Sequence, residues 1–342
     1  METIKKLTEN PFTIIEKQLE KITIVCDNNY GLYNGKTGLC ICYFLLAAIT
    51  EDKGFEAKAR ILLDELSDNI NSVEQLDFAN GLAGIGWGIE WLVQNKFVDA
   101  NTDEVLEDLD DELYKSVVYA KAKSLSLLNG TLGKAMFFHK RLIAQNPGTT
   151  RYRNLCTQEC LVLLSDEINE TLLNKETGLL SSERATQNYT SLQLTEIAQC
   201  LIFLTKLVPL GINAEITEKL ICNILSFIQE SKDVAFSCND KEWHEAYHYL
   251  LYAYLLAGTK LSDNCIVKNA TNLLKDYSFA NSSTNAPHFF NQYLNNRVMN
   301  LLQQKTKEQP ELIPTTIFDI LVSCRPYIDS QLHSWNEAWL LS

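Results

Sequence analysis

The sequence predicts an all-α protein whose helical hairpins close into an α/α toroid, a double ring of inner and outer helices. First, the motif N-G-x-x-G occurs three times, at residues 34–38, 80–84 and 129–133, at intervals of 46 and 49 residues. Second, an apolar run follows each motif, and an amphipathic segment lies between one run and the next. Third, the alternating pattern that is typical of β-strands is essentially absent.

Two kinds of helix alternate along the chain. A helix that is apolar nearly all round must be buried, whereas a helix with one apolar stripe keeps its other face in water. The buried, inner kind is predicted after each of the three motifs and at residues 191–207, 243–257, 287–302 and 315–324. The striped, outer kind is predicted at residues 55–72, 102–124, 151–174, 215–231 and 263–277. This alternation gives about seven hairpins, and because no linker-like segment interrupts it, residues 1–342 are expected to form a single domain.

Glycines stand at the starts of the first three inner helices, although the chain has only 14 glycines and a glycine inside a helix costs about 1 kcal/mol relative to alanine. They are Gly35 and Gly38, Gly81 and Gly84, and Gly130 and Gly133. One interpretation is that they leave backbone N–H groups unpaired and directed at a central cavity. The other is close helix packing, with Gly84 and Gly88 on one face. We expect Gly35, Gly81 and Gly130 to lie at one end of the ring, each at the N-terminus of an inner helix.

The composition narrows the possible partners and compartments. A formal net charge of −13 argues against nucleic-acid binding, which needs clustered Lys and Arg. The N-terminal residues carry charges every few positions, so no signal peptide is predicted. The longest uncharged apolar stretches, residues 37–50 and 246–259, have 14 residues each and are too short to span a membrane. The ten cysteines include no C-x-x-C pair and are expected to be reduced core residues of a cytoplasmic protein.

Residues 99–112 form an acidic run with eight carboxylates and no Lys or Arg. Asn101 or Thr102 is expected to cap a helix in this run, because carboxylates in a first helical turn are favoured by the helix dipole. The run is interpreted as a solvated outer face, with a basic partner as the alternative.

Two segments resemble the lanthionine synthetase C-like family, in the variant found beside bacterial peptide-modification genes. They are residues 80–92, NGLAGIGWGIEWL, followed by the acidic residues 98–114. Residues 334–342, SWNEAWLLS, are similar to the usual ending of that group. The resemblance covers the whole chain and is most specific in the first three repeats and the last residues. It implies a seven-repeat α/α toroid that acts in lanthipeptide biosynthesis.

The resemblance also implies a zinc ion at the mouth of the toroid, held by a Cys of a W-C-Y-G stretch and by the Cys and His of a C-H-G stretch. Zinc would lower the pKa of a peptide cysteine, which then adds to a dehydrated Ser or Thr. At these positions the chain has His244, Pro287 and His288, and Glu196 stands near the position of the implied catalytic histidine of the fourth repeat. Two of the three ligands are therefore missing, so no zinc is expected, and His244, His248 and His288 are the remaining metal candidates.

The sequence leaves two functions open. In the first, the chain is a catalytically degenerate toroid, a pseudoenzyme that binds a precursor peptide or a peptide-modifying enzyme at a mouth formed by Trp243, His244, Glu245 and His288. In the second, it is an active enzyme, either a thioether cyclase or an acid/base catalyst that uses His244, Glu245 and Glu196.

Overall fold

The computed structural model describes residues 19–20, 28–33, 35–121, 124–180, 189–231 and 240–280. Every regular element in these ranges is a helix, which confirms the all-α prediction. The described chain belongs to two compact units, divided between Asp99 and Ala100. The predicted sixth and seventh repeats and the C-terminal nonapeptide lie outside the described residues, and the single-domain prediction stays a prediction.

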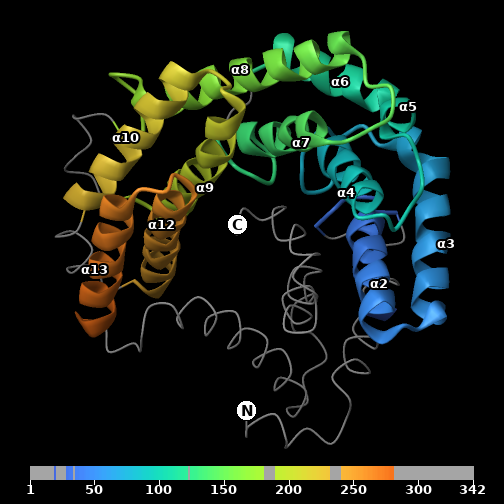
Figure 1. Ribbon diagram of the computed structural model, residues 1–342, viewed down its shortest axis with the longest axis horizontal. Helices are drawn as coiled ribbons and strands as arrows, with labels where there is room; N and C mark the ends of the chain where they lie inside the picture. The colour runs from blue at the N-terminus through green and yellow to red at the C-terminus, as the bar shows by residue number, and fades with distance from the viewer. Residues whose placement is uncertain are drawn as a thin grey trace, which may run out of the picture. The chain divides into compact units, whose positions relative to one another are not determined.

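The first unit contains two of the predicted inner helices and the outer helix between them. Its elements are α2 (Lys36–Thr50), α3 (Lys53–Asn69), the 3-10 turn η2 (Ile70–Ser72) and α4 (Leu82–Gln94). All residues of α2 up to Leu46 are buried, as are all residues of α4 up to Leu92. Helix α3 buries one stripe, formed by Phe55, Ala59, Leu62 and Leu66. Helix α2 packs against both α3 and α4 (Figure 1).

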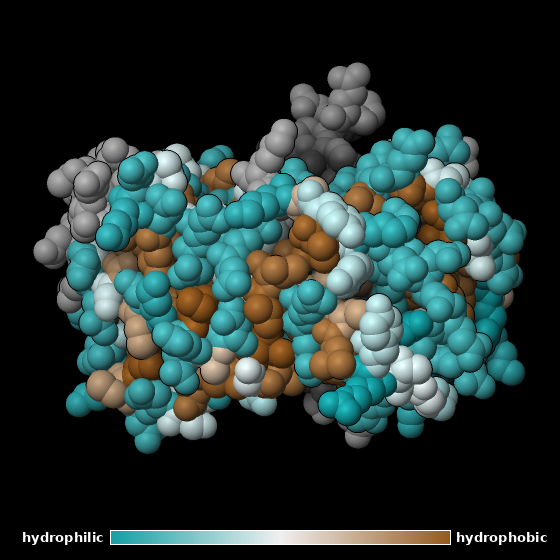
Figure 2. Space-filling model, turned by 90° about the horizontal axis from the view of Figure 1, so that it is seen from above, coloured by the Kyte–Doolittle hydropathy of each residue, from teal (hydrophilic) through white to brown (hydrophobic). Residues whose placement is uncertain are grey.

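The second unit continues the same alternation. Its elements are α5 (Thr102–Val105), α6 (Glu107–Val118), α7 (Thr131–Ile143), α8 (Arg151–Leu173), α9 (Ser191–Leu207), η4 (Val208–Leu210), α10 (Ala214–Glu230), α12 (Lys241–Lys260) and α13 (Asn264–Ala280). The inner helices α7, α9 and α12 pack in succession, and each contacts the outer helix that follows it, α8, α10 and α13 respectively (Figure 1). The outer helices keep polar faces toward solvent, so the face shown in Figure 2 is largely hydrophilic.

The outer helix predicted at residues 102–124 differs from the prediction. The chain leaves helical geometry at Leu106, where φ is −105° and ψ is 14°, and a shorter helix then ends at Val118. The predicted cap is confirmed for Asn101, whose side-chain oxygen accepts a hydrogen bond from the backbone N–H of Asp103 at 3.2 Å.

One segment of the second unit, Ser191–Leu210, is long and apolar enough to cross a membrane by length and composition alone. Within that window 56% is buried inside the fold, and α9, which forms most of it, packs against α7, α10 and α12. We therefore interpret α9 as a core helix.

The glycines at the starts of α2, α4 and α7 make room for a repeated backbone hydrogen bond. Gly35, Gly81 and Gly130 are the N-cap residues of these helices. In each case the preceding loop folds back, and a carbonyl seven positions before the first helical residue accepts that residue's N–H. The bonds are Lys36 N to Asn29 O at 2.8 Å, Leu82 N to Gln75 O at 2.9 Å and Thr131 N to Ser124 O at 3.0 Å.

A side chain at any of the three N-caps would collide with that loop. A Cβ atom added at Gly35, Gly81 or Gly130 would lie no more than 2.6 Å from the accepting carbonyl oxygen itself. The φ angles are −137°, −107° and −124°, so a left-handed conformation is not the reason for glycine. The interpretation that these glycines leave unpaired N–H groups is therefore wrong for the first N–H of each helix, because the loop carbonyl accepts it.

The alternative interpretation, close packing, is confirmed at two other glycines of α4. A Cβ atom at Gly84 would collide with the carbonyl of Phe78, and one at Gly88 would collide with the Thr37 side chain of α2.

Within the first unit, the loops that carry Gly35 and Gly81 lie against each other. Tyr33 N donates to Ala79 O at 2.9 Å, and the Asn29 amide donates to the Asn80 side-chain oxygen at 3.2 Å. These two glycines therefore lie at the same end of their helices, as predicted. That Gly130, in the second unit, joins them stays a prediction.

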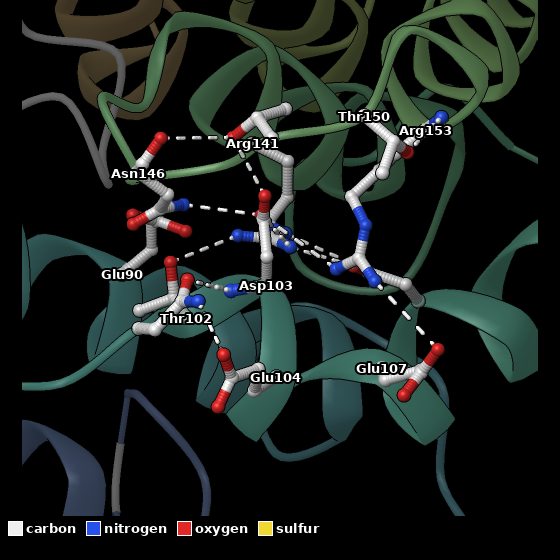
Figure 3. A network of polar contacts seen from close by, with 12 residues as sticks. Glu90, Thr102, Asp103, Glu104, Glu107, Arg141, Asn146, Thr150 and Arg153 are labelled. Atoms are coloured by element: carbon white, nitrogen blue, oxygen red, sulfur yellow. Dashed lines mark hydrogen bonds and ion pairs between the residues drawn. The ribbon is translucent and has the colours of Figure 1, made fainter.

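Residues 103 and 110 of the acidic run belong to a partly buried ion network (Figure 3). The Arg141 side chain, 2% exposed, donates to both carboxylate oxygens of Asp110 at 2.9 and 2.7 Å and to Asp103 at 3.0 Å. Arg153 donates to Asp110 at 3.1 Å, and the Thr149 hydroxyl donates to Asp103 at 2.6 Å. The network ties α5 and α6 to the end of α7 and the start of α8.

The solvated-face interpretation of the run is therefore wrong for Asp103 and Asp110. It holds for the exposed carboxylates Glu104, Glu107, Asp108, Asp111 and Glu112. Burial raises the pKa of Asp103, but the hydrogen bond from Thr149 and the charges of the two arginines lower it by more, so the pKa lies below its ordinary value. For Asp110 burial outweighs these effects and the pKa is raised.

We predict that Gly81→Ala lowers the free energy of unfolding by about 1–3 kcal/mol, because the methyl group displaces the Gln75 carbonyl from the helix N-terminus. Gly54→Ala in the first turn of α3 is the control, since the nearest atom to its Cβ is an Asp52 side-chain oxygen at 3.1 Å. It is expected to leave stability unchanged or raise it by up to about 1 kcal/mol. Chemical denaturation measures both, and equal effects would contradict the capping argument.

We predict that Arg141→Met lowers the free energy of unfolding by about 3–5 kcal/mol at pH 7, because it leaves two carboxylates in the network with Arg153 alone. Arg60→Met is the control, since Arg60 and Glu56 form an exposed i,i+4 pair worth about 0.5 kcal/mol or less. Because the folded-state pKa of Asp103 is lowered, its contribution is lost as pH falls through that pKa. The gap between wild type and Arg141→Met should therefore narrow in acid, and a constant gap from pH 7 to pH 3 would contradict the assignment.

Candidate functional site

The predicted mouth lies where α12 begins, beside the start of α9. Helix α9 opens with a capping box, in which Thr190 and Gln193 each accept a hydrogen bond from the backbone N–H of the other. Helix α12 opens at Asp240, whose carboxylate accepts from Glu242 N at 3.0 Å. The indole N–H of Trp243 donates to the carbonyl of Tyr189 at 2.8 Å, so the two helix starts are joined directly.

Trp243 is a buried anchor of this region, with only 7% of its surface exposed. Its ring stacks on Tyr247 one turn later, with the centroids 5.2 Å apart and the planes 12° apart. Tyr189 in turn makes an edge contact with Phe227 of α10, with centroids 4.8 Å apart. The sequence indicated the aromatic side chains of α12, but it gave no signal that Tyr189 and Phe227 support them.

The next two residues face more of the solvent. His244 is partly exposed and Glu245 is exposed, both in the first turns of α12. His248 is buried one turn later, and its Nδ1 atom lies 2.9 Å from the backbone carbonyl of His244. A carbonyl only accepts, so Nδ1 carries the proton, and burial lowers the pKa of this imidazole. The structure thus places His244 and His248 on successive turns, while His288 lies outside the described residues.

Glu196 is a buried carboxyl group in the second turn of α9, with 9% of its surface exposed. In the described ranges no residue forms a hydrogen bond or ion pair with it. Burial raises its pKa, which favours the neutral acid. The two candidate carboxylates of the acid/base hypothesis therefore differ in environment, since Glu245 is exposed.

The donors of the described residues do not fit the thiolate-rich zinc site that the resemblance implies. Zinc sites of that kind need ionised cysteines. Burial instead raises the pKa of Cys40 and Cys200, and it raises that of Cys160 to about 12, so these thiols stay protonated. Across residues 19–280, apart from the gaps given above, no three His, Cys, Asp or Glu side chains gather in a way that would hold a metal ion.

Comparisons with known proteins agree with this fold. A model of the lanthionine synthetase C-like family matches residues 2–123. Among solved structures, nisin cyclase superposes on 96% of this chain and 96% of its own length, with a TM-score of 0.63 and 14% sequence identity. No curated protein matches its sequence.

The toroid prediction is thus confirmed by the likeness to nisin cyclase, which at this identity concerns the fold alone. Where the resemblance implies a cysteine, the first turn of α12 has His244, next to the buried Trp243.

We predict that Glu196→Gln raises the free energy of unfolding at pH 8, because the wild-type fold must keep an ionised carboxylate in a buried position. Because the folded-state pKa of Glu196 is raised, the free energy of unfolding of the wild type falls as pH rises from the ordinary pKa of a glutamate to the raised one. The two proteins should therefore converge near pH 4. Glu245→Gln is the exposed control, with an expected change within about 0.5 kcal/mol at both pH values. A destabilised Glu196→Gln at pH 8 would contradict the placement of an unpaired carboxylate.

Proposed function

We propose that the protein binds a precursor peptide of a lanthipeptide-type pathway in the bacterial cytoplasm, as a catalytically degenerate member of its family. One observation carries the proposal. His244 and Glu245 are accessible to solvent in the first turns of α12, and the hydrogen bond from Trp243 to Tyr189 fixes the start of that helix. A helix fixed at its start by a buried indole holds the two polar side chains in place before a ligand arrives, which lowers the entropic cost of binding.

The chemistry of these side chains favours binding over thioether formation. A peptide thiol has a pKa of about 8.5 and needs a metal or a cation to ionise near neutral pH. Burial raises the pKa of the Cys40, Cys160 and Cys200 thiols, and a carboxylate at position 245 opposes a second negative charge. Glu245 and His244 are instead suited to hydrogen bonds with peptide N–H, hydroxyl and ammonium groups.

Glu196 supports a second candidate function, acid/base catalysis. A carboxyl group whose pKa is raised by burial is suited to deliver a proton to a bound substrate, as general acids do. The enzyme hypothesis assigns this role to Glu196, with Glu245 and His244 holding the substrate.

The test uses a Ser-, Thr- and Cys-containing peptide encoded beside the gene for this protein, with binding followed by calorimetry. We expect wild type to bind it, and Glu245→Ala and His244→Ala each to weaken binding about tenfold, a loss of about 1.4 kcal/mol. Glu215→Ala, an exposed glutamate in the first turn of α10, is the matched control and should bind like wild type. Trp243→Ala is avoided, because the buried indole supports the fold.

Two further readouts separate the alternatives. Elemental analysis is expected to find well under one equivalent of zinc in protein purified without added metal. Stoichiometric zinc that is lost in His244→Ala would overturn the degenerate assignment, and so would cyclisation of a dehydrated form of the peptide by wild type that Glu196→Gln abolishes. Equal binding by wild type and Glu245→Ala would remove this end of α12 from the peptide site.

A further inference from the structure

The outer helices α6 and α8 lie side by side and run in the same direction. Three contacts join the two helices or their flanking residues. The residue numbers increase along both helices from one contact to the next. They are Arg153 to Asp110 at 3.1 Å, the Tyr114 hydroxyl to Glu159 at 3.1 Å, and Lys121 to Glu170 at 2.6 Å. The two helices therefore present one continuous outer surface.

Helix α8 carries large apolar side chains on its outer side as well as on its inner side. Its inner side buries Thr157, Cys160, Leu161, Leu164, Ser165, Ile168 and Leu172. On the outer side, Tyr152, Leu155 and Leu163 are 77%, 53% and 38% exposed. At 100° per residue these three side chains fall within a sector of about 80°, so they form a stripe. The C-terminal end of α6 adds Val118 and, just beyond it, Tyr119, which are 37% and 82% exposed.

Other outer helices lack such a stripe in the residues that the structure describes. Helix α3 exposes one large apolar side chain, Ile61, and α10 exposes none. Single exposed apolar residues are ordinary on protein surfaces, whereas a row of them on one helix face is typical of an interaction site. In Figure 2, which looks down on the side of α8, brown side chains form a band between teal ones.

Exposed carboxylates lie within this stripe as well as beside it. The exposed acidic residues of the two helices are Glu107, Asp108, Asp111, Glu112, Glu159, Asp166 and Glu170. Lys115 and Lys121 each lie within 2.7 Å of a glutamate, Glu112 and Glu170 respectively, so their charges are balanced within the surface. Arg151 is an exposed cation at the start of α8. At 100° per residue Glu159, Asp166 and Glu170 fall in the same sector of α8 as the three apolar side chains, so the surface carries apolar and negatively charged side chains next to one another.

We propose that this outer surface of α6 and α8 is a docking site for a positively charged amphipathic helix of a partner protein. Apolar side chains of that helix contact Tyr152, Leu155 and Leu163, and its Lys and Arg side chains pair with the carboxylates that lie among and beside them. The same negative charge disfavours a nucleic acid or an anionic membrane as the occupant. The site is distinct from the start of α12, so it leaves the peptide site free.

The probe is a synthetic 18-residue amphipathic helix of Leu and Lys, with a Leu/Glu peptide of the same pattern as its counterpart. Fluorescence anisotropy with the full chain at 0.15 M salt is expected to show binding of the Leu/Lys peptide alone. The double variant Leu155→Ser/Leu163→Ser should weaken that binding at least tenfold, as should Asp108→Asn/Asp111→Asn. Ile61→Ser on α3 and Glu215→Gln/Glu218→Gln on α10 are the matched apolar and charge controls and should bind like wild type. Because all these positions are exposed, each variant should keep the wild-type melting temperature.

Several results would overturn the proposal. They are the absence of binding by wild type, equal losses in the test and control variants, and equal binding of the Leu/Glu peptide. Binding of wild type to anionic phospholipid vesicles through Leu155 and Leu163 would assign the surface to a membrane instead. A wild-type dimer that Leu155→Ser/Leu163→Ser dissociates would assign it to a second copy of the chain.

Discussion

The hydrogen bond between a helix N-terminus and the loop before it is the constraint on which the first three repeats depend. An inner helix is buried, so the N–H groups of its first turn have no access to water and need partners within the protein. Side chains supply such partners at the inner helices α9 and α12, where Thr190 and Asp240 act as caps, and Asp52 does the same for the outer helix α3. At α2, α4 and α7 a backbone carbonyl does so, and it reaches the helix only because the N-cap residue has no Cβ atom. The first glycine of each N-G-x-x-G motif is the N-cap residue that this geometry requires.

The helix pattern could be predicted closely because burial imposes one periodicity on inner helices and another on outer ones. The predicted range 191–207 coincides with α9, and the prediction 151–174 differs from α8 by one residue. Hydrophobic periodicity did not indicate the break at Leu106, next to which the ion network of Asp103 and Asp110 forms. Arg141 offered the missed signal: a guanidinium inside an apolar run must find a carboxylate, and the acidic run preceding it in sequence was the available source.

The sequence predicted where the candidate residues of α12 lie in the fold, while their role in a functional site stays a prediction. His244 and Glu245 do stand at the start of an inner helix, as the alignment of repeats suggested. The burial of Trp243 depends on the carbonyl of Tyr189, which lies 54 residues earlier and belongs to the approach to another helix. No local pattern can indicate such a contact. Likewise, the raised pKa of Glu196 follows from what surrounds α9 in space, which the residue sequence of α9 alone does not specify.

The N-cap glycines have a consequence for how such a chain tolerates mutation. A clash between two side chains can be relieved by a substitution at either position, so two contacting positions can change together during evolution. The clash at Gly35, Gly81 or Gly130 is with main-chain oxygen, which every amino acid possesses, so no second substitution in the loop removes it. His244 and Glu196 carry no such backbone restriction, since both lie in regular helical turns. The candidate site residues His244 and Glu196 are therefore freer to diverge than the glycines at the starts of the inner helices.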